Sequence, residues 1–422
     1  MDADLIIHNS GQLITCSSGG KPKRRDEMLD VGIIEDGAVA IAGGKFIGVG
    51  TTKQVLRDFQ SDETVDAAGR VVCPGFVDPH THIVYSGDRL NEFEMKIKGI
   101  AYLDILAAGG GIISTVQKTR EADAAQLIKS AQQRLYKMLA CGTTTCEIKT
   151  GYGLDTATEL KMLDVIDDLN KTHPMTIVPT FLAAHAVPPE FRENANGYVD
   201  LICREMLQRA WKWFVASSFH GKVPFFCDVF CEKGAFTLEQ SRKVLETAKS
   251  LGFKLKAHVE QFNDIGGSRM ALELGAASVD HLDAISNEEI SVLAGSSTVG
   301  VVIPTENFNA GKAQFTPARK LIDAGCAIAL TTDFNPGSAP CPSQPMAMAI
   351  AARYQKLTPA ECINAATINA AHAIGLGDRV GSIEVGKRAD LLILEARDYR
   401  QLTYEFGGNL VERVFCGGRS AV

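Results

Sequence analysis

The sequence predicts an α/β protein built as a (β/α)8 barrel of the TIM type, with a small β domain contributed by both chain ends. Three observations lead to this class. Eight apolar, strand-like runs recur between residues 71 and 379 with helical patterns between most of them, which is the repeat of such a barrel. Residues 1–70 and 380–422 read instead as short strands with glycine turns. The length of 422 residues accommodates a barrel of about 250 residues and an appended domain.

Both chain ends carry the same pattern of short strands. A hairpin is predicted around Gly43-Gly44, because two glycines separate two apolar runs there. We therefore expect one discontinuous domain of residues 1–70 plus 380–422, and a catalytic barrel of residues 71–379. The strand-like segments of the small domain are residues 4–9, 12–16, 37–50, 380–394 and 409–419.

The barrel region alternates between apolar runs and helical patterns. Two of the clearest helices are predicted at residues 123–142 and 237–252, and the second begins with a capping pattern of Thr237 followed by Gln240. The eight predicted strands cover residues 71–80, 142–150, 175–187, 225–232, 253–260, 277–283, 298–305 and 327–335.

Composition and charge exclude several partners. Hydrophobic residues make up 45% and charged residues 22% of the chain, which is ordinary for a globular protein. The formal net charge is −7, so we expect neither nucleic acid nor an anionic membrane as a partner. Eleven scattered cysteines without a CxxC pair, and a start without a basic and then apolar leader, predict a reducing cytoplasmic location.

Five of the nine histidines and one aspartate fall near the C-terminal ends of predicted strands, where barrel active sites are built. His80 and His82 end the first strand as HxH, and residues i and i+2 of a strand point to one face. His258 ends the fifth strand and Asp333 ends the eighth. Taken singly, His258 could be a core histidine and Asp333 a turn residue. Together these four side chains suit zinc or iron(II), with Asp333 also able to take a proton from an attacking water.

Further candidates surround this set. His281 ends the sixth strand and His185 the third, and either could handle a proton or bind a substrate group. Tyr152 lies between glycines after the second strand, as a buried tyrosine or as a hydrogen-bond donor to substrate. Arg89 follows the first strand, and it could form a surface ion pair with Glu92 or hold a substrate carboxylate.

At this level of detail the chain resembles the amidohydrolase superfamily, through PGFVDPHTH, a later single histidine on strand five and an aspartate ending strand eight. Within it, the chain is similar to the imidazolonepropionases, which act in histidine degradation. The segments that carry this resemblance are GDRLNEFEMKIKGIAYLDILAAGGGIISTV, EIKTGYGLDTATELKML, FLAAHAVPPE, DVFCEKGAFTLEQSR and TTDFNPGSAP.

The resemblance implies a distorted barrel with a β-sandwich-like domain from both termini, and a cytoplasmic homodimer. It implies one zinc or iron ion per subunit, since no lysine matches a metal bridge. The reaction implied is hydrolysis of the cyclic amide 4-imidazolone-5-propanoate to N-formimidoyl-L-glutamate. The alternatives are a related amidohydrolase that opens or deaminates another heterocycle, and an inactive barrel used for binding.

The resemblance also assigns roles to residues. It makes His281 the proton-handling histidine. The metal ligands match His80, His82, His258 and Asp333, and the substrate contacts match Arg89, Tyr152, His185, Gln261, Asn335, Gly337 and Ser338.

Two segments depart from the usual family pattern. After His258 the chain reads HVEQFNDIGG, and glutamine at position 261 cannot act as a base. The general base is then Asp333 or His281, with Glu260 as an outside candidate. The second departure is TENFNAGKAQF, residues 305–315, a polar stretch that could edge the substrate pocket and alter the choice of heterocycle.

Overall fold

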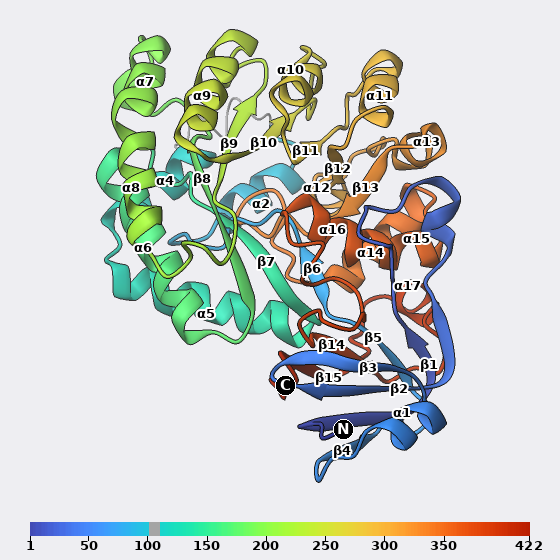
Figure 1. The fold of residues 1–422 in the computed structure, drawn as a ribbon. Helices are drawn as coiled ribbons and strands as arrows, with labels where there is room; N and C mark the ends of the chain where they lie inside the picture. The colour runs from blue at the N-terminus through green and yellow to red at the C-terminus, as the bar shows by residue number, and fades with distance from the viewer. Residues whose placement is uncertain (101–109) are drawn as a thin grey trace.

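The computed structural model describes residues 1–100 and 110–422. Residues 101–109, which form part of the first segment of family resemblance, lie outside the described residues. Two eight-stranded sheets organise the described chain. One forms the barrel, and the other lies at one end of it, with the blue N-terminal and red C-terminal strands side by side (Figure 1).

The barrel sheet is parallel and runs in chain order from β6 to β13. This confirms the predicted fold class. Its strands are β6 (Phe76–Asp78), β7 (Thr143–Lys149), β8 (Thr176–Ala184), β9 (Phe226–Cys231), β10 (Lys254–Val259), β11 (Ser278–His281), β12 (Val299–Val302) and β13 (Ala327–Leu330).

Helices surround the barrel strands (Figure 1). They are α2 (Leu90–Ile97), α4 (Ile112–Glu121), α5 (Ala124–Ala140), α6 (Thr156–Thr172), α7 (Ala195–Leu201), α8 (Leu207–Ala216), α9 (Leu238–Leu251), α10 (Gly267–Leu274), α11 (Asn287–Ala294), α12 (Pro304–Asn309), α13 (Ala318–Ala324), α14 (Gln344–Tyr354), α15 (Pro359–Ala365) and α16 (Ile368–Ala373). Helices α5 and α9 match the two clearest sequence predictions. Thr237 and Gln240 form the expected capping box at the start of α9.

The barrel is closed by side chains where its first and last strands meet. The sheet order ends at β6 and β13 without a backbone ladder between them. The Asp78 carboxylate accepts hydrogen bonds from the hydroxyls of Thr331 and Thr332, each at 2.5 Å. The Gln344 amide donates to the carbonyls of Val77 at 3.0 Å and Leu330 at 3.3 Å. We call this junction the seam, and it joins the strand that leads to His80 with the strand that leads to Asp333.

The second sheet, which we call the terminal sheet, mixes strands from both chain ends. Their order is β16-β15-β14-β5-β1-β2-β3, with β4 paired to β1. A shared core lies against it, including Leu5, Ile41, Leu391 and Phe415. The strands are β1 (Leu5–Ile14), β2 (Ile33–Ala42), β3 (Lys45–Thr51), β4 (Thr64–Asp66), β5 (Val71–Pro74), β14 (Leu391–Leu394), β15 (Val411–Cys416) and β16 (Arg419–Ser420). The short helix α1 (Thr52–Asp58) packs against β2 and β3, whereas α17 (Gln401–Tyr404) packs against α14 and α15.

Three strand predictions need correction. The run 71–80 is two strands, because the chain leaves the terminal sheet at β5 and enters the barrel at β6 after Gly75. The sheet of the terminal segments therefore includes Val71–Pro74, beyond the expected boundary at residue 70. Residues 4–9 and 12–16 are one strand, β1, interrupted by a bulge at Asn9, whose φ is 56°. The segment 380–394 becomes a strand only at β14.

The described part of the chain holds no helix with both the length and the apolar character that a membrane crossing requires.

Candidate active site

Three predicted metal-binding histidines converge at the C-terminal ends of the barrel strands. His80 and His82 follow β6, and His258 lies on β10. One ring nitrogen from each lies within 4.8 Å of the others. The Nε2 atoms of His80 and His82 are 3.3 Å apart. All three side chains are buried, so the barrel interior brings three imidazoles to one point.

Asp333 joins this cluster from the loop after β13. Its Oδ1 lies 3.7 Å from the Nε2 of His80 and 3.7 Å from the Nε2 of His82. Its backbone takes the left-handed region at φ 49°, which few residues other than glycine adopt. Burial raises the pKa of the Asp333 carboxyl well above its usual range. The carboxylate would need a nearby positive charge to stay ionised there.

The donor set fits a bound cation. Burial lowers the pKa of His80 and of His82 well below the usual value, so both rings are neutral at pH 7 and offer lone pairs. The Nδ1 of His82 is buried without a hydrogen-bond partner among the described residues. Three imidazoles and one carboxylate are ligands that zinc and iron both accept.

Two carboxylates stand behind these histidines, and neither was foreseen from the sequence. Asp280 Oδ2 lies 2.6 Å from the Nδ1 of His80, which leaves the Nε2 of that ring facing His82. Asp228 Oδ2 lies 3.0 Å from the Nδ1 of His258. Carboxylates in this position orient metal-binding imidazoles and fix their tautomers.

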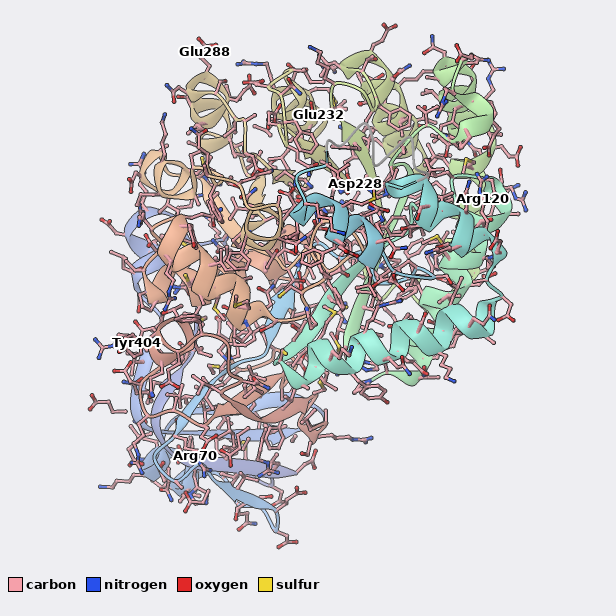
Figure 2. The ribbon with its side chains drawn as sticks, turned by 180° about the vertical axis from the view of Figure 1, so that it is seen from behind. Arg70, Arg120, Asp228, Glu232, Glu288 and Tyr404 are labelled. Atoms are coloured by element: carbon pink, nitrogen blue, oxygen red, sulfur yellow. The ribbon has the colours of Figure 1, made fainter. Side chains whose placement is uncertain are left out.

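Two buried lysines balance these carboxylates. Lys149 Nζ lies 2.7 Å from Asp228 and 2.9 Å from Glu147, and Lys256 Nζ lies 3.1 Å from Glu147 and 3.5 Å from Asp280. All five side chains have 0% exposure. Burial by itself would lower the pKa of Lys149, but the charges of Asp228, Glu147 and Asp280 outweigh it and raise that pKa. We call these five residues the buried ion network (Asp228 is labelled in Figure 2).

The sequence does hold a signal for this network. Glu147 and Lys149 are two residues apart on β7, and Lys256 and His258 are two apart on β10. Side chains at that spacing share one face of a strand. Charged residues at period two inside barrel strands therefore indicate a polar barrel interior.

His281, His185 and Tyr152 surround the cluster, as the strand-end argument expects. The His281 ring lies 5.2 Å from that of His258 and 5.5 Å from that of His80, between centroids. The His185 ring stacks on His82 at 4.9 Å and lies 5.5 Å from Tyr152. Burial lowers the pKa of His185 to about 3, so this ring is neutral and can only exchange neutral hydrogen bonds.

Arg89 lies against the loop that follows Asp333. A Cβ atom placed on Gly337 would meet Arg89 Nη1 at 2.2 Å, so any larger residue there would displace the guanidinium. The Arg89 side chain is 12% exposed, and its Nε lies 3.9 Å from Glu92. The pair with Glu92 therefore exists, but it is buried rather than on the surface.

Asn335 and Ser338 shape the same loop from within. The Asn335 side-chain oxygen accepts from the backbone amides of Gly337 and Ser338, both at 2.8 Å. Its amide nitrogen donates to the Ser338 hydroxyl at 2.8 Å and to the Asp333 carbonyl at 2.7 Å. Both residues therefore hold the loop that carries Asp333, beside the guanidinium of Arg89.

Gln261 and Glu260 are placed differently from these candidates. The Glu260 carboxylate accepts from the backbone amide of Ser268 at 3.1 Å and from its hydroxyl, so it is occupied at the start of α10. Glu232, just after β9 (Figure 2), holds the loop beyond Gln261 by accepting from the amides of Phe262 at 2.8 Å and Asn263 at 3.2 Å. No hydrogen bond to the Gln261 side chain is found within the described residues, and its substrate contact stays a prediction.

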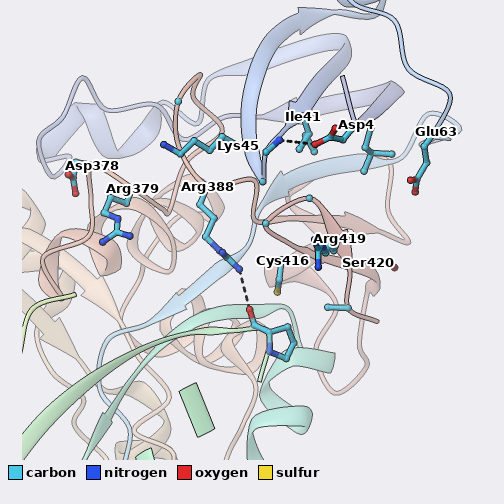
Figure 3. A pocket seen from close by; sticks show the side chains of 18 of the residues that line it. Asp4, Ile41, Lys45, Glu63, Asp378, Arg379, Arg388, Cys416, Arg419 and Ser420 are labelled. Carbon is cyan, nitrogen blue, oxygen red and sulfur yellow. Dashed lines mark hydrogen bonds between the residues drawn. The ribbon is translucent and has the colours of Figure 1, made fainter. Parts of the chain in front are cut away.

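A separate cavity among the described residues lies away from the histidine cluster. It has a volume of about 1200 Å³ between the terminal sheet and the N-terminal end of the barrel strands, and its lining includes Lys45, Arg379 and Arg388 (Figure 3). Arg388 donates to Asp390 at 2.9 Å and to the Pro174 carbonyl at 3.2 Å. The described residues that line this cavity include no histidine, so it lacks the converging ring nitrogens of the histidine cluster.

Comparison with known proteins agrees with this geometry. The profile of the amidohydrolase family matches residues 71–421. The imidazolonepropionase of Chloroflexus aggregans is 51% identical over 420 residues, which cover 99% of this chain and 98% of that protein. The imidazolonepropionase of Herpetosiphon aurantiacus is 50% identical over 417 residues, covering 99% and 97%.

A solved structure supports the fold alone. An adenosine deaminase from Xanthomonas campestris with bound zinc superposes with a TM-score of 0.70 at 20% sequence identity, covering 100% of this chain and 93% of that one. The sequence relationships are much stronger, and they extend over the strand-end histidines and Asp333. The chain belongs to the amidohydrolase family and, within it, to the imidazolonepropionases.

Proposed function

We propose that this chain hydrolyses the ring amide of 4-imidazolone-5-propanoate to give N-formimidoyl-L-glutamate, a step of histidine degradation. One observation carries the proposal. His80, His82, His258 and Asp333 converge at the strand ends in a chain that is about half identical, over almost its whole length, to imidazolonepropionases. Relatives at this identity support the substrate, and the donor set supports hydrolysis rather than a binding role.

The four converging residues would hold one divalent ion, zinc or iron. When bound, such an ion supplies a Lewis acid and makes water nucleophilic near neutral pH. The nitrogen and oxygen donors of His80, His82, His258 and Asp333 suit both metals. Asp280 and Asp228, behind the rings of His80 and His258, would keep the opposite ring nitrogens available for the ion.

We assign substrate positioning to residues that surround the histidine cluster and to the loop after Asp333. Arg89 can form two hydrogen bonds with the propionate carboxylate, because a guanidinium presents two parallel N–H groups. This guanidinium lies against Gly337, in the loop that follows Asp333. Tyr152 and His185 lie beside His82 and can hydrogen-bond the heterocycle. The loop of Asn335, Gly337 and Ser338, with Gln261 from the loop after β10, completes the proposed contacts.

The proton balance assigns two further roles. Water adds to the ring carbonyl carbon, the ring C–N bond breaks, and the leaving nitrogen takes up a proton. Asp333 or His281 can accept the proton of the attacking water and return it to that nitrogen. The structure supports these two over Glu260, whose carboxylate is occupied by Ser268. His281 is neutral at pH 7, because burial lowers its pKa, so its ring nitrogens are not already fully protonated.

The homodimer and the cytoplasmic location implied by the family resemblance are also part of the proposal. All eleven cysteines lie in the described residues and are free thiols, which suits a reducing compartment. Light scattering on the purified protein tests the oligomeric state, and a mass near one subunit of 45.4 kDa would contradict the dimer.

The test of activity is incubation of the purified protein with a panel of imidazolones, hydantoins and aminoheterocycles, followed by loss of ultraviolet absorbance. We expect turnover of the imidazolone propionate. Faster turnover of another heterocycle would favour the alternative, a related amidohydrolase that acts on that heterocycle.

His80→Ala and Asp333→Ala should lower metal content and abolish turnover. His281→Asn should lower kcat by about 10² to 10⁴ with metal retained, whereas Gln261→Ala should mainly raise KM.

A further inference from the structure

The backbone around His281 is held in an unusual conformation. His281 has φ 86° and the next residue, Leu282, has φ 66°. Two consecutive side-chain-bearing residues in the left-handed region are costly, and such strain persists only where surrounding contacts enforce it. Contacts at the end of β11 must therefore hold the chain in this conformation.

The His281 ring does little to hold itself in place. Its Nδ1 is buried and has no hydrogen-bond partner among the described residues. Neighbouring backbone bonds fix the turn in part, with Leu282 donating to the Val259 carbonyl at 3.2 Å and Ala284 donating to the Glu260 carbonyl at 2.7 Å. Because no hydrogen bond holds the Nδ1 atom, the position of the ring depends on the main chain that carries it.

Asp283 is the anchored residue of this turn. Its carboxylate accepts from Asn307 Nδ2 at 2.7 Å, from Lys312 Nζ at 2.9 Å, and from the Thr316 hydroxyl. The side chain is only 11% exposed. Three donors from residues 304–316 thus converge on one carboxylate two positions after His281. We call these three contacts the clamp.

Residues 304–316 are themselves tied to the rest of the site. Lys312 Nζ also lies 2.9 Å from Glu306. Burial opposes the charge of this lysine, but Asp283 and Glu306 outweigh it and raise its pKa. Asn309 Nδ2 donates to the Ser338 carbonyl at 2.7 Å, on the loop that follows Asp333. This segment, which departs from the usual family pattern, therefore contacts both the turn that follows His281 and the loop that carries Asp333.

We propose that Asp283, held by Asn307, Lys312 and Thr316, is a positioning residue that keeps His281 oriented for proton transfer. The inference rests on the proposed function, because the role of His281 is itself proposed there. Asp283 acts through the backbone of His281 and is not assigned any contact with substrate. The polar character of residues 305–315 then reflects this clamp rather than a different heterocycle.

The experiment uses Asp283→Asn in the full-length, metal-loaded enzyme. The amide would present donors to a site that already holds donors, so the clamp should open. We expect kcat to fall 10- to 100-fold while KM stays within about threefold and metal content is unchanged. Asp200→Asn is the matched control, because it removes an exposed ion pair with Lys243, at 2.6 Å, and should leave kcat unchanged. Unchanged kcat in Asp283→Asn would overturn the proposal.

A double-mutant cycle separates positioning from general damage. If Asp283 acts through His281, adding Asp283→Asn to His281→Asn should lower kcat by less than twofold further. An equal loss in both backgrounds would overturn the clamp. If His281→Asn itself keeps full activity, the proposed role of His281 falls, and the positioning role falls with it. If His281→Asn is impaired but Asp283→Asn is not, only the clamp is wrong.

A milder variant covers the case in which Asp283→Asn does not fold. Lys312→Met removes one of the three donors and keeps the length of the side chain. We expect a 3- to 10-fold fall in kcat that again disappears in the His281→Asn background. A fall of the same size in both backgrounds, or no fall at all, would contradict the proposal.

Discussion

His80 is held from behind by a carboxylate, and this contact is the clearest test of the buried ion network. Its Nδ1 lies 2.6 Å from Asp280, so Asp280→Asn removes a negative charge without removing volume. Loss of such a partner typically costs 10- to 100-fold in metal affinity. We expect a loss of about that size, measured by equilibrium dialysis of the metal-free protein against buffered zinc.

The matched control for Asp280 is Asp168→Asn, since that side chain is 54% exposed and lies on α6, away from the cluster. Circular dichroism of the metal-free variants checks that both remain folded. Unchanged zinc affinity in Asp280→Asn would mean that Asp280 serves only to balance the charges of Lys149 and Lys256.

Arg89 gives a second prediction at the residue scale. Arg89→Met keeps the aliphatic stem but removes the charged hydrogen bonds to the proposed propionate. We expect kcat/KM to fall by a factor that corresponds to roughly 2–4 kcal/mol of lost transition-state stabilisation. The fall should come mainly from a higher KM, with metal content unchanged. Steady-state kinetics measure this, and Arg57→Met, at a side chain that is 71% exposed, serves as the control. An unchanged kcat/KM would leave Arg89 only its structural contacts with Thr115 and Glu92.

The sequence predicts the position of the candidate ligands well but not the groups behind them. His80, His82, His258 and Asp333 could be found because the C-terminal ends of parallel strands meet at one face of a barrel. Asp228 and Asp280 could not be matched to particular rings, because their partners depend on the register between neighbouring strands. His258 pairs with Asp280 in the β10–β11 ladder, yet Asp280 reaches across to His80.

At the scale of elements, the eight barrel strands were predictable because apolar runs alternate with amphipathic helices. The division of residues 71–80 was not, because β5 and β6 form one apolar run around Gly75. A Cβ atom on Gly75 would meet the Thr144 hydroxyl at 2.2 Å, so glycine permits the close approach where the chain changes sheets. Only the positions of the neighbouring strands show that the run serves two sheets.

The seam gives a prediction at this scale. Gln344 is fully buried and donates to the carbonyls of Val77 and Leu330, on the two strands that lack a ladder. Gln344→Met keeps the side-chain volume but leaves both carbonyls without this donor. Buried groups left unpaired cost about 1–3 kcal/mol, and we expect the free energy of unfolding to fall by about that amount in urea titrations.

Gln133→Met is the matched control for the seam, because Gln133 is exposed on α5 and the same change there should be nearly neutral. If both variants were equally stable, the seam would be held by Asp78 with Thr331 and Thr332, and the Gln344 bonds would contribute nothing measurable.

At the scale of the whole molecule, the two sheets share one apolar interior. A single cluster of buried side chains includes Ile14, Leu392 and Val414 of the terminal sheet together with Phe76 and Leu139 of the barrel region. The chain passes directly from β5 to β6, and the amide of Gly75 donates to the Asp390 carbonyl at 3.0 Å. We therefore expect the terminal sheet and the barrel to unfold together.

The tryptophans make this coupling measurable. The chain has two, Trp211 and Trp213, and both lie on α8 of the barrel. Their fluorescence therefore reports on the barrel alone.

Phe415→Leu weakens the core of the terminal sheet, where Phe415 is 1% exposed. Because truncation to alanine there would cost roughly 3–5 kcal/mol, the milder change should cost roughly 1–3 kcal/mol. In a single cooperative unit, the fluorescence midpoint should fall by roughly 1–3 °C together with the circular dichroism midpoint. Phe406→Leu, at a side chain 65% exposed, should change neither. A fluorescence midpoint that stays fixed while the dichroism transition broadens or splits would show that the terminal sheet unfolds on its own.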